Sequence, residues 1–351
     1  MACKQALHMN EGEGETSYAR NSSIQSAEQD RMKPLIEAAI VDLCHKTETM
    51  MIADLGCSSG PNALALVSIA VEAIHSIQQP PPEVCVFLND LPNNDFNTVV
   101  KRLVTLRRSN EPPVVMTGIV PGSFYERLFT SGSLHLVCSS TSSLQWLSQV
   151  PQVLMRNHIP AYDIDEHARR ERLPMVHEAY ARQFRIDFTR FLELRAIELA
   201  PGGQMVVSII GRHSDRIASK FFFTFEIIPQ ILSVMVLEGV IDKAKYDSFY
   251  VPVYGPSKEE LEEIIRDEGS FSINKMLVDD FTSDEEMARM TPSRFAAHLR
   301  AAFEQIVVQH FGEVMDEFVR VMERRWSPEG SLQDQIARDP VAMLALSLTK
   351  A

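Results

Sequence analysis

The chain has 351 residues, of which 45% are hydrophobic and 23% are charged, values that are ordinary for a globular protein and exclude wholesale disorder. Its 34 lysines and arginines are outnumbered by 47 aspartates and glutamates, which gives a net charge of −13. Because the few basic clusters, Arg169-Arg170 and Arg324-Arg325, are interleaved with acids, the charge pattern argues against nucleic acid as a partner.

The apolar residues and the cysteines bear on the compartment of the protein. The sequence opens on Met1-Ala2-Cys3-Lys4-Gln5 without the apolar run of a signal peptide, and no stretch approaches the roughly eighteen apolar residues of a spanning helix. We therefore expect a cytoplasmic protein with no membrane partner. The scattered cysteines lack the paired spacing of a zinc site, and we expect reduced thiols at Cys3, Cys44, Cys57, Cys85 and Cys138.

Short apolar runs recur along the chain and are separated by helix-length segments. Their near-continuous hydrophobicity is typical of strands that are buried on both faces of a parallel sheet. Strands that alternate with helices predict an α/β fold with a doubly wound, Rossmann-like sheet of seven strands. The predicted strands lie at residues 50–56, 84–91, 113–120, 134–140, 204–211, 271–278 and 341–348.

Several long segments fall outside this alternation, and one of them, residues 284–325, has apolar residues that step by three and four, as in a helix. No Gly/Ser-rich linker and no internal repeat divides the chain, so we expect one unit over residues 1–351. Its core sheet would comprise residues of about 50–149, 201–211, 270–281 and 340–350. An interleaved helical cap would be built from residues 1–49, 150–200, 212–268 and 282–335.

The most informative motif is an apolar strand that ends in an acidic residue and a glycine-bearing turn, at residues 52–62. Glycines let the ribose of a nucleotide-like ligand lie against the backbone, while a carboxylate accepts its polar hydrogens. The turn reads Gly-x-x-x-Gly and lacks the Gly-x-Gly-x-x-Gly order of a dinucleotide site. S-adenosyl-L-methionine, which has no phosphate, fits this pattern better.

A second acidic terminus, residues 87–92, ends the next predicted strand. Asp90 in this position could accept both ribose hydroxyls, and Leu91 could flank the adenine. An aspartate at a strand end is more often a turn or helix cap when it stands alone. Together with the glycine turn, however, it favours a cofactor site.

The same turn offers a rival interpretation, because Gly56-Cys57-Ser58-Ser59-Gly60 matches the Gly-x-Ser-x-Gly nucleophile elbow of serine hydrolases. Only one predicted strand precedes Ser58, and no oxyanion loop such as His-Gly-Gly occurs, so the context argues against this role. A general base could still come from a downstream histidine, with candidates at His135, His213, His298 and His310. The hydrolase hypothesis therefore stays open.

Two further motifs have simpler explanations. Asp163-Ile164-Asp165-Glu166-His167 superficially suggests metal ligands but lacks the glycine and the spacing of a calcium loop, so we expect the solvated start of a helix. The aromatic run at residues 221–225 is more typical of core than of a ligand pocket.

Several motifs, in order along nearly the whole chain, resemble those of the plant SABATH family of S-adenosylmethionine-dependent carboxyl methyltransferases. This family includes salicylate, benzoate and jasmonate methyltransferases, and its fold is the seven-stranded methyltransferase sheet predicted above. The matching stretches are His8-Met9, residues 14–22 with Gln25, and residues 54–62, 87–97, 121–125, 144–151 and 201–205.

The resemblance implies roles for individual residues. The cofactor would contact Tyr18, Cys57, Asn62, Asp90, Leu91, Ser123 and Phe124, with Ser139 and Ser140 close by. Gln25 and Trp146 would hold the acceptor carboxylate, and the pocket around the acid would be lined by Gln145, Ile210, Phe225 and Leu299. A carboxylic acid is already ionised at neutral pH, so its oxygen needs in-line placement on the methyl group and no general base.

Departures from the family pattern bear on the substrate. Phe225 stands where salicylate-type members carry a tryptophan, and Leu299 stands where a methionine is common. The segment Asp247-Ser248-Phe249-Tyr250 lacks the asparagine near which some relatives bind magnesium, so we expect no metal. Benzoate or salicylate is the favoured acid, with jasmonate or indole-3-acetate as alternatives. A non-catalytic ligand binder is a second hypothesis, and the resemblance also implies a homodimer.

Overall fold

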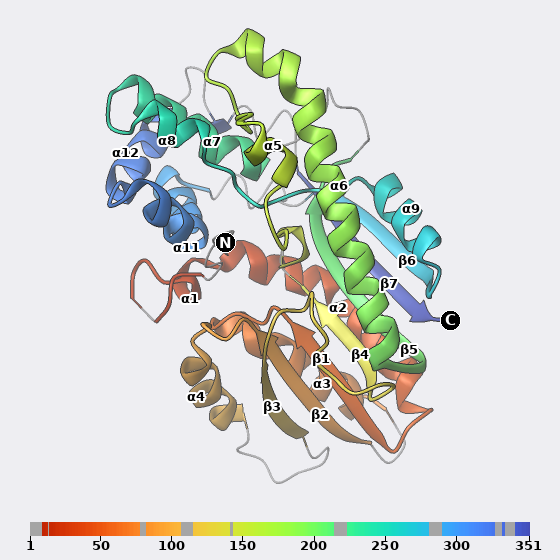
Figure 1. Cartoon of the computed structure of the whole chain (residues 1–351). Coiled ribbons are helices and arrows are strands. Elements are labelled where there is room, and N and C mark those ends of the chain that lie inside the picture. The colour runs from red at the N-terminus through yellow and green to blue at the C-terminus, as the bar shows by residue number, and fades with distance from the viewer. Residues whose placement is uncertain are drawn as a thin grey trace.

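A seven-stranded sheet organises the protein in its computed structural model (Figure 1). The structure describes residues 9–12, 14–77, 82–106, 115–140, 143–213, 223–280, 290–326, 332–333 and 341–351. The strand order is β3-β2-β1-β4-β5-β7-β6. The strands are β1 (Thr49–Leu55), β2 (Glu83–Asp90), β3 (Val115–Pro121), β4 (Leu134–Ser139), β5 (Leu199–Gly211), β6 (Phe271–Asp280) and β7 (Ala342–Lys350).

All seven predicted strands are confirmed, with one correction to their direction. Strands β1 to β5 run parallel, as their continuous hydrophobicity predicted. Strand β7, however, lies antiparallel between β5 and β6. Seven of its nine residues are buried, so both of its faces are covered like those of a parallel strand. A run of apolar residues reports burial on both faces and carries no information on direction.

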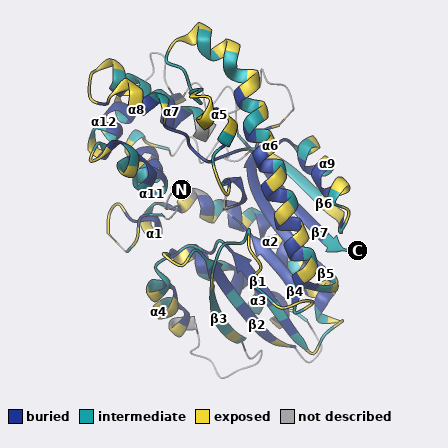
Figure 2. Cartoon of the chain, in the orientation of Figure 1, coloured by how far each residue is buried: buried dark blue, intermediate teal, exposed yellow. Residues whose placement is uncertain are grey.

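Helices cover both faces of the sheet, which confirms the doubly wound architecture. On one face α2 (Ser23–Cys44), α3 (Ala65–His75) and α4 (Phe96–Leu106) pack on side chains of β1 and β2 such as Ile52 and Val86. On the other face α6 (Glu166–Glu198) and α9 (Lys258–Glu268) contribute to a larger apolar cluster with β4, β5 and β7. The inner strands between these layers are largely dark blue, or buried, in Figure 2, whereas most residues of the edge strands β3 and β6 are intermediate or exposed. The expected burial on both faces therefore holds for the inner strands and not for these two edge strands.

A separate group of helices lies beside one end of the sheet (Figure 1). It comprises α7 (Phe223–Leu237), α8 (Lys243–Asp247), α11 (Pro292–Phe311) and α12 (Met315–Trp326), with contacts between α11 and α12, α12 and α7, and α7 and α8. The helical periodicity of residues 284–325 thus corresponds to two helices, separated at Gly312, which has a φ of +88°. Residues 284–289 lie outside the described chain.

The division of the chain into sheet and cap segments stays a prediction. Within the ranges assigned to the cap, α2 contacts β4, β5 and β7, α6 contacts β5, and α9 contacts β6. These three helices therefore lie on the sheet itself. Among the described helices, none is both long and apolar enough to cross a membrane.

Candidate functional site

The two acidic strand ends meet where the strand order of the sheet reverses. Strand β1 pairs with β2 on one side and with β4 on the other. The crevice outside the carboxyl ends of such strands is where open α/β sheets bind ligands. The N–H groups of Gly56 and Cys57 both donate to the carbonyl of Asn89 at 2.9 Å, which ties the turn after β1 to the end of β2.

The carboxylate of Asp90 is fixed by the turn it faces. One oxygen accepts the N–H of Ser58 and the other accepts the N–H of Leu91, each at 2.7 Å. Ser58 has a φ of +58°, a conformation that few residues other than glycine adopt, and its carbonyl accepts the amide of Asn94 at 3.1 Å. Burial raises the pKa of Asp90, and the two backbone hydrogen bonds reduce this shift. Each oxygen keeps a lone pair that a ligand hydroxyl can use.

The surroundings of the turn are strongly acidic. Burial and the charge of Asp90 raise the pKa of Asp54 to about 7. The pKa of the Cys57 thiol is raised by burial and by both aspartates, and that of Tyr18 by burial, by Glu28 and by Asp90. A phosphate would be repelled by these charges, whereas a ligand with a positive sulfur and an ammonium group would be attracted. The acidic charge therefore fits S-adenosylmethionine.

Buried polar atoms without partners lie in the residues around this turn. Gln25 Oε1, Gln29 Oε1 and Ser58 Oγ are buried, and no protein group in the described chain bonds to them. The amide of Gln29 donates to the carbonyl of Asn62 at 3.2 Å and to Ser140 Oγ at 3.1 Å, which joins α2 to the turn and to the end of β4. Since a buried polar atom without a partner is destabilising, these atoms are suited to a ligand with hydroxyl and amino groups.

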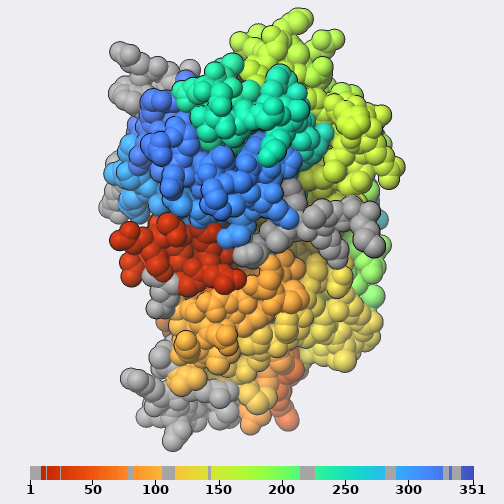
Figure 3. Space-filling model, turned by 60° about the vertical axis from the view of Figure 1, so that its left-hand side comes forward, coloured from red at the N-terminus to blue at the C-terminus, as the bar shows by residue number. Residues whose placement is uncertain are grey.

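The N-terminal segment, residues 9–12 and 14–22, lies over the glycine turn. A Cβ at Gly60 would approach the Ala19 Cα to 3.3 Å, so glycine allows this close contact. Asn10 N–H donates to the carbonyl of Ala301 on α11 at 3.0 Å, and Tyr18 N–H donates to the carbonyl of Asn10 at 2.9 Å. Figure 3 shows this segment in red between the orange surface and the blue C-terminal helices. Tyr18 is thereby buried next to the turn.

A loop after β3, residues 122–129, carries two further predicted cofactor residues, Ser123 and Phe124. The Asn89 amide donates to the carbonyls of Val120 at 2.7 Å and Gly122 at 2.9 Å, and Gly122 N–H donates to the Asp90 carbonyl at 2.9 Å. The loop is therefore attached directly to the end of β2. Ser123 and Phe124 are both half-buried.

The predicted acceptor residue Trp146 follows a short 3-10 helix, η2 (Ser143–Gln145). Leu147 N–H donates to the carbonyl of Pro252 at 2.8 Å, and Tyr254 N–H donates to the carbonyl of Gln145 at 2.9 Å, so this segment is held beside residues 252–254. The ring of Trp146 packs against Phe303 of α11, with 5.3 Å between the ring centres. Leu299, one turn earlier on α11, is buried in the same apolar cluster.

The structure places the other predicted site residues as follows. Ser139 Oγ donates to the carbonyl of Leu55 at 2.8 Å, which joins the ends of β4 and β1. Gln145 is buried beside Trp146. Ile210 belongs to the apolar cluster on the α2 face, while Trp146 and Leu299 belong to the cluster on the other face. Phe225 is in α7, but its side chain lies outside the described part of the chain.

Sequence reasoning missed several polar residues of this region. Gln29 is one turn after Gln25 on α2, and that spacing could have identified it. Asn89 directly precedes Asp90 and could have been considered with it. Glu28 is completely buried and accepts the hydroxyl of Ser208 on β5 at 2.5 Å, a contact that no local pattern indicates.

The structure does not bring the serine and a histidine base of the hydrolase hypothesis into contact. Each candidate base has another partner: His135 Nδ1 accepts the N–H of Met51, His213 pairs with Asp280, His298 contacts the Asn21 carbonyl and His310 the Lys245 carbonyl. Ser58 Oγ has no partner among the described residues, so no nucleophile and base are joined there.

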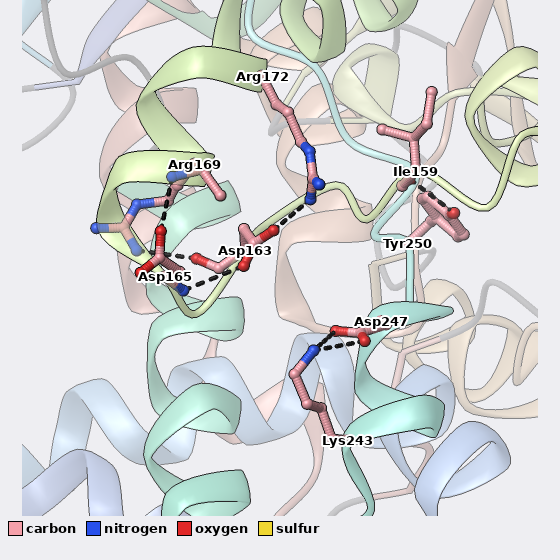
Figure 4. A network of polar contacts seen from close by, with 9 residues as sticks. Ile159, Asp163, Asp165, Arg169, Arg172, Lys243, Asp247 and Tyr250 are labelled. Atoms are coloured by element: carbon pink, nitrogen blue, oxygen red, sulfur yellow. Dashed lines mark hydrogen bonds and ion pairs between the residues drawn. The ribbon is translucent and has the colours of Figure 1, made fainter.

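The acidic segment before α6 is a helix start, as predicted (Figure 4). The side chain of Asp165 caps α6 by accepting the N–H of Ala168 at 2.8 Å. Asp163 pairs with Arg172, and its carbonyl accepts Arg169 Nη1 at 3.0 Å. In the described chain no group of three or more metal-binding side chains occurs, and the carboxylate of Asp247 pairs with Lys243. The expected lack of a metal stays a prediction.

Comparisons with known proteins agree with this geometry. A family model described as "SAM dependent carboxyl methyltransferase" matches residues 4–351. The chain is 40% identical over 343 residues to probable jasmonic acid carboxyl methyltransferase 1 of Theobroma cacao, covering 90% of this chain and 92% of the relative. It is 38% identical over 335 residues to benzoic acid/salicylic acid carboxyl methyltransferase 2 of Petunia hybrida, covering 90% and 91%. The structure of loganic acid methyltransferase with SAH matches at a TM-score of 0.80 and 30% identity, and the match covers 97% of this chain and 98% of that one.

Proposed function

The chain belongs to the SABATH family of S-adenosylmethionine-dependent carboxyl methyltransferases, and on this premise we propose which residues hold its substrates and which acid it methylates. Its cofactor, S-adenosylmethionine, supplies a methyl group on a positively charged sulfur. On the side of the cofactor, Asp90 would accept the ribose hydroxyls and Leu91 would flank the adenine. The rest of the cofactor site would be formed by Tyr18, Cys57, Asn62, Ser123 and Phe124, with Ser139 and Ser140 close by.

Gln25 and Trp146 would hold the carboxylate of the acid. The observation that supports this most is the amide of Gln25, which is buried and makes no hydrogen bond within the described chain, so its NH2 group is available to donate to the carboxylate. Gln25 is one turn from Gln29, which bonds to Asn62 and Ser140, so the acceptor would lie next to the cofactor. Amide and indole N–H groups are neutral donors that can orient a carboxylate without the tight ion pair that would weaken its nucleophilicity.

The transfer itself would need orientation and the exclusion of water. An ionised acid attacks the methyl group directly, so no side chain has to take a proton. The opposite charges of the reactants cancel as the methyl group transfers, and a dry site favours such a less charged transition state. In-line placement can be worth several kcal/mol, about 7–11 in well-oriented intramolecular reactions.

Apolar side chains beside Trp146 support a largely apolar acid. Its indole packs on Phe303, and Leu299 is buried one turn earlier on the same helix. We therefore favour benzoate or salicylate, with jasmonate or indole-3-acetate as alternatives. The cacao and petunia relatives are named for acids of both kinds, and this chain is nearly equally identical to them, at 40% and 38%.

A panel of acids with a radiolabelled methyl donor tests the proposed substrate. We expect organic-extractable label with benzoate or salicylate, and less or none with long-chain acids. A clear preference for jasmonate or indole-3-acetate would replace our first choice. If no acid on the panel yields an ester although calorimetry shows S-adenosylhomocysteine binding, the chain is the non-catalytic binder of the second hypothesis.

We also propose that the protein acts in the cytoplasm as a homodimer. The four described cysteines are free, which is typical of a reducing compartment. Exposed apolar side chains on the contacting helices α5 (Gln152–Arg156) and α6, namely Val153, Met155 and Met175, support association. Light scattering on the purified protein and imaging of a fluorescent fusion would test the two points separately.

A further inference from the structure

We propose that helix α6 is the positioning element of the site: its buried Arg195–Glu198 pair fixes the cofactor-side loop, and its buried Asp187 fixes the acceptor-side segment. The cofactor-side loop is residues 122–129, and the acceptor-side segment is residues 144–148. The inference rests on the roles proposed above for Ser123, Phe124 and Trp146. It assigns a function to residues that contact neither substrate and that act through the backbone of these two segments.

The cofactor-side anchor is a completely buried ion pair. Arg195 Nε donates to Glu198 at 2.7 Å, and both side chains have no exposed area. The guanidinium also donates to the carbonyls of Phe124 at 2.8 Å and Glu126 at 3.1 Å. The other oxygen of Glu198 accepts the N–H groups of Leu128 at 2.6 Å and Phe129 at 3.0 Å. Two side chains thus bond four backbone groups of one loop.

The acceptor-side anchor lies two turns earlier on the same helix. Asp187 accepts the N–H of Ser148 at 2.8 Å and its hydroxyl at 2.6 Å. Gln183, one turn before, donates to the same carboxylate at 3.0 Å. Ser148 is two residues after Trp146, so these bonds restrain the backbone from which the indole projects.

A direct bond joins the two anchored segments. The hydroxyl of Tyr125 donates to the carbonyl of Trp146 at 2.8 Å. Helix α6, the loop and the acceptor-side segment therefore form a closed triangle of hydrogen bonds. Because methyl transfer requires the acid oxygen and the methyl group to be in line, an arrangement that fixes both sides to one rigid helix sets their separation.

The buried charges support a positioning role over a purely stabilising one. Burial lowers the pKa of Arg195 and raises that of Asp187, so neither ion is in an environment that favours its charge. A well-packed apolar pair of similar size is often as stable as a buried ion pair, or more so. Apolar side chains, however, could not hold carbonyl and N–H groups of a loop in place.

Variants of the two anchors separate their effects. Arg195→Met/Glu198→Leu should raise the dissociation constant of S-adenosylhomocysteine about tenfold, because several charge-assisted bonds to the loop are lost, and should leave the KM of the acid within about twofold. Asp187→Asn should raise the KM of the acid and leave the dissociation constant of S-adenosylhomocysteine within about twofold. Ser148→Ala, at an exposed residue, is a milder change that should act in the same direction. Tyr125→Phe should lower kcat with little effect on either constant.

A matched control exists on the same helix. Arg190 and Glu193 have the same spacing as Arg195 and Glu198 but are exposed, so Arg190→Met/Glu193→Leu should behave as wild type. Thermal unfolding verifies that each variant is folded. If the buried double variant does not fold, Arg195→Lys, which keeps the ion pair but not the fork of donors, takes its place.

Equal shifts of the cofactor and acid constants in both anchor variants would overturn the inference, as would constants that stay at wild-type values in folded variants. A wild-type protein that esterifies no acid would instead contradict the proposed function. The calorimetric measurement with S-adenosylhomocysteine would still test the cofactor-side anchor in that case.

Discussion

Replacing Asp90 with asparagine tests the cofactor side of the site most directly. Both carboxylate oxygens accept backbone N–H groups at 2.7 Å, one from Ser58 and one from Leu91. An asparagine of nearly the same shape offers one oxygen, so one of these N–H groups faces an amide NH2 and loses its bond. The change also removes a negative charge from the place where we locate the ribose hydroxyls.

Asp90→Asn should change both the folding stability and the affinity for the cofactor. A buried N–H without a partner costs about 1–3 kcal/mol of folding stability. Removal of the charge of Asp90 acts in the opposite direction, because this charge helps to raise the pKa of Asp54 to about 7. We therefore expect a net loss of less than about 2 kcal/mol. Cofactor binding loses a hydrogen bond to a charged acceptor, worth about 1.5–3 kcal/mol, or about 10- to 150-fold in Kd.

Isothermal titration calorimetry with S-adenosylhomocysteine measures the binding effect, and thermal unfolding measures the effect on stability. Asp267→Asn is the control, since this carboxylate is exposed on α9 and pairs with Arg185 at 3.1 Å. The reasoning is refuted if Asp90→Asn binds within twofold of wild type while its unfolding temperature falls. That result would make Asp90 a structural cap of the turn.

Four other substitutions test the remaining assignments. Gln25→Ala and Trp146→Ala should each raise the KM of the acid or abolish turnover while S-adenosylhomocysteine still binds, and unchanged kinetics would reject the carboxylate assignment. Burial and Asp90 raise the pKa of Asp54 from 3.8 to about 7, so the folded state holds a proton that the unfolded chain releases in this range. The free energy of unfolding should therefore fall as the pH rises from 3.8 to about 7, and denaturant unfolding should show a flatter pH dependence for Asp54→Asn; identical slopes would contradict the assignment. Ser58→Ala should not abolish methyl transfer, and a serine-reactive phosphonate should not label the wild type; labelling at Ser58 would restore the hydrolase hypothesis.

The strands and the first two site motifs could be predicted because their signals are local. The five inner strands are apolar runs that are mostly buried, and the edge strands β3 and β6 are apolar runs of the same kind although they are largely exposed or half-buried. Asp54 and Asp90 end two strands that are neighbours in the sheet. Their meeting follows from parallel pairing alone. The antiparallel direction of β7 could not be predicted, because burial of both faces gives the same pattern in either direction.

The anchors on α6 show why the rest of the site could not be predicted. Arg190–Glu193 and Arg195–Glu198 have the same residue types and the same spacing on one helix. The sequence favours a solvated surface pair in both cases, yet the second pair is completely buried against residues 124–129. The two pairs differ only in that a loop about 70 positions earlier in the sequence packs on the second one. The role of Glu28 on α2 is hidden in the same way, because it accepts a hydrogen bond from Ser208, which lies 180 positions later in the sequence.

The place of β7 in the sheet has a consequence for biosynthesis. This strand is encoded after all the other described strands, yet it fills the gap between β5 and β6. Until its residues emerge from the ribosome, both neighbours present unpaired edges, which are prone to aggregation. Completion of the sheet is therefore a late event, and a chain truncated before Ala342 should accumulate in the insoluble fraction of an expressing cell.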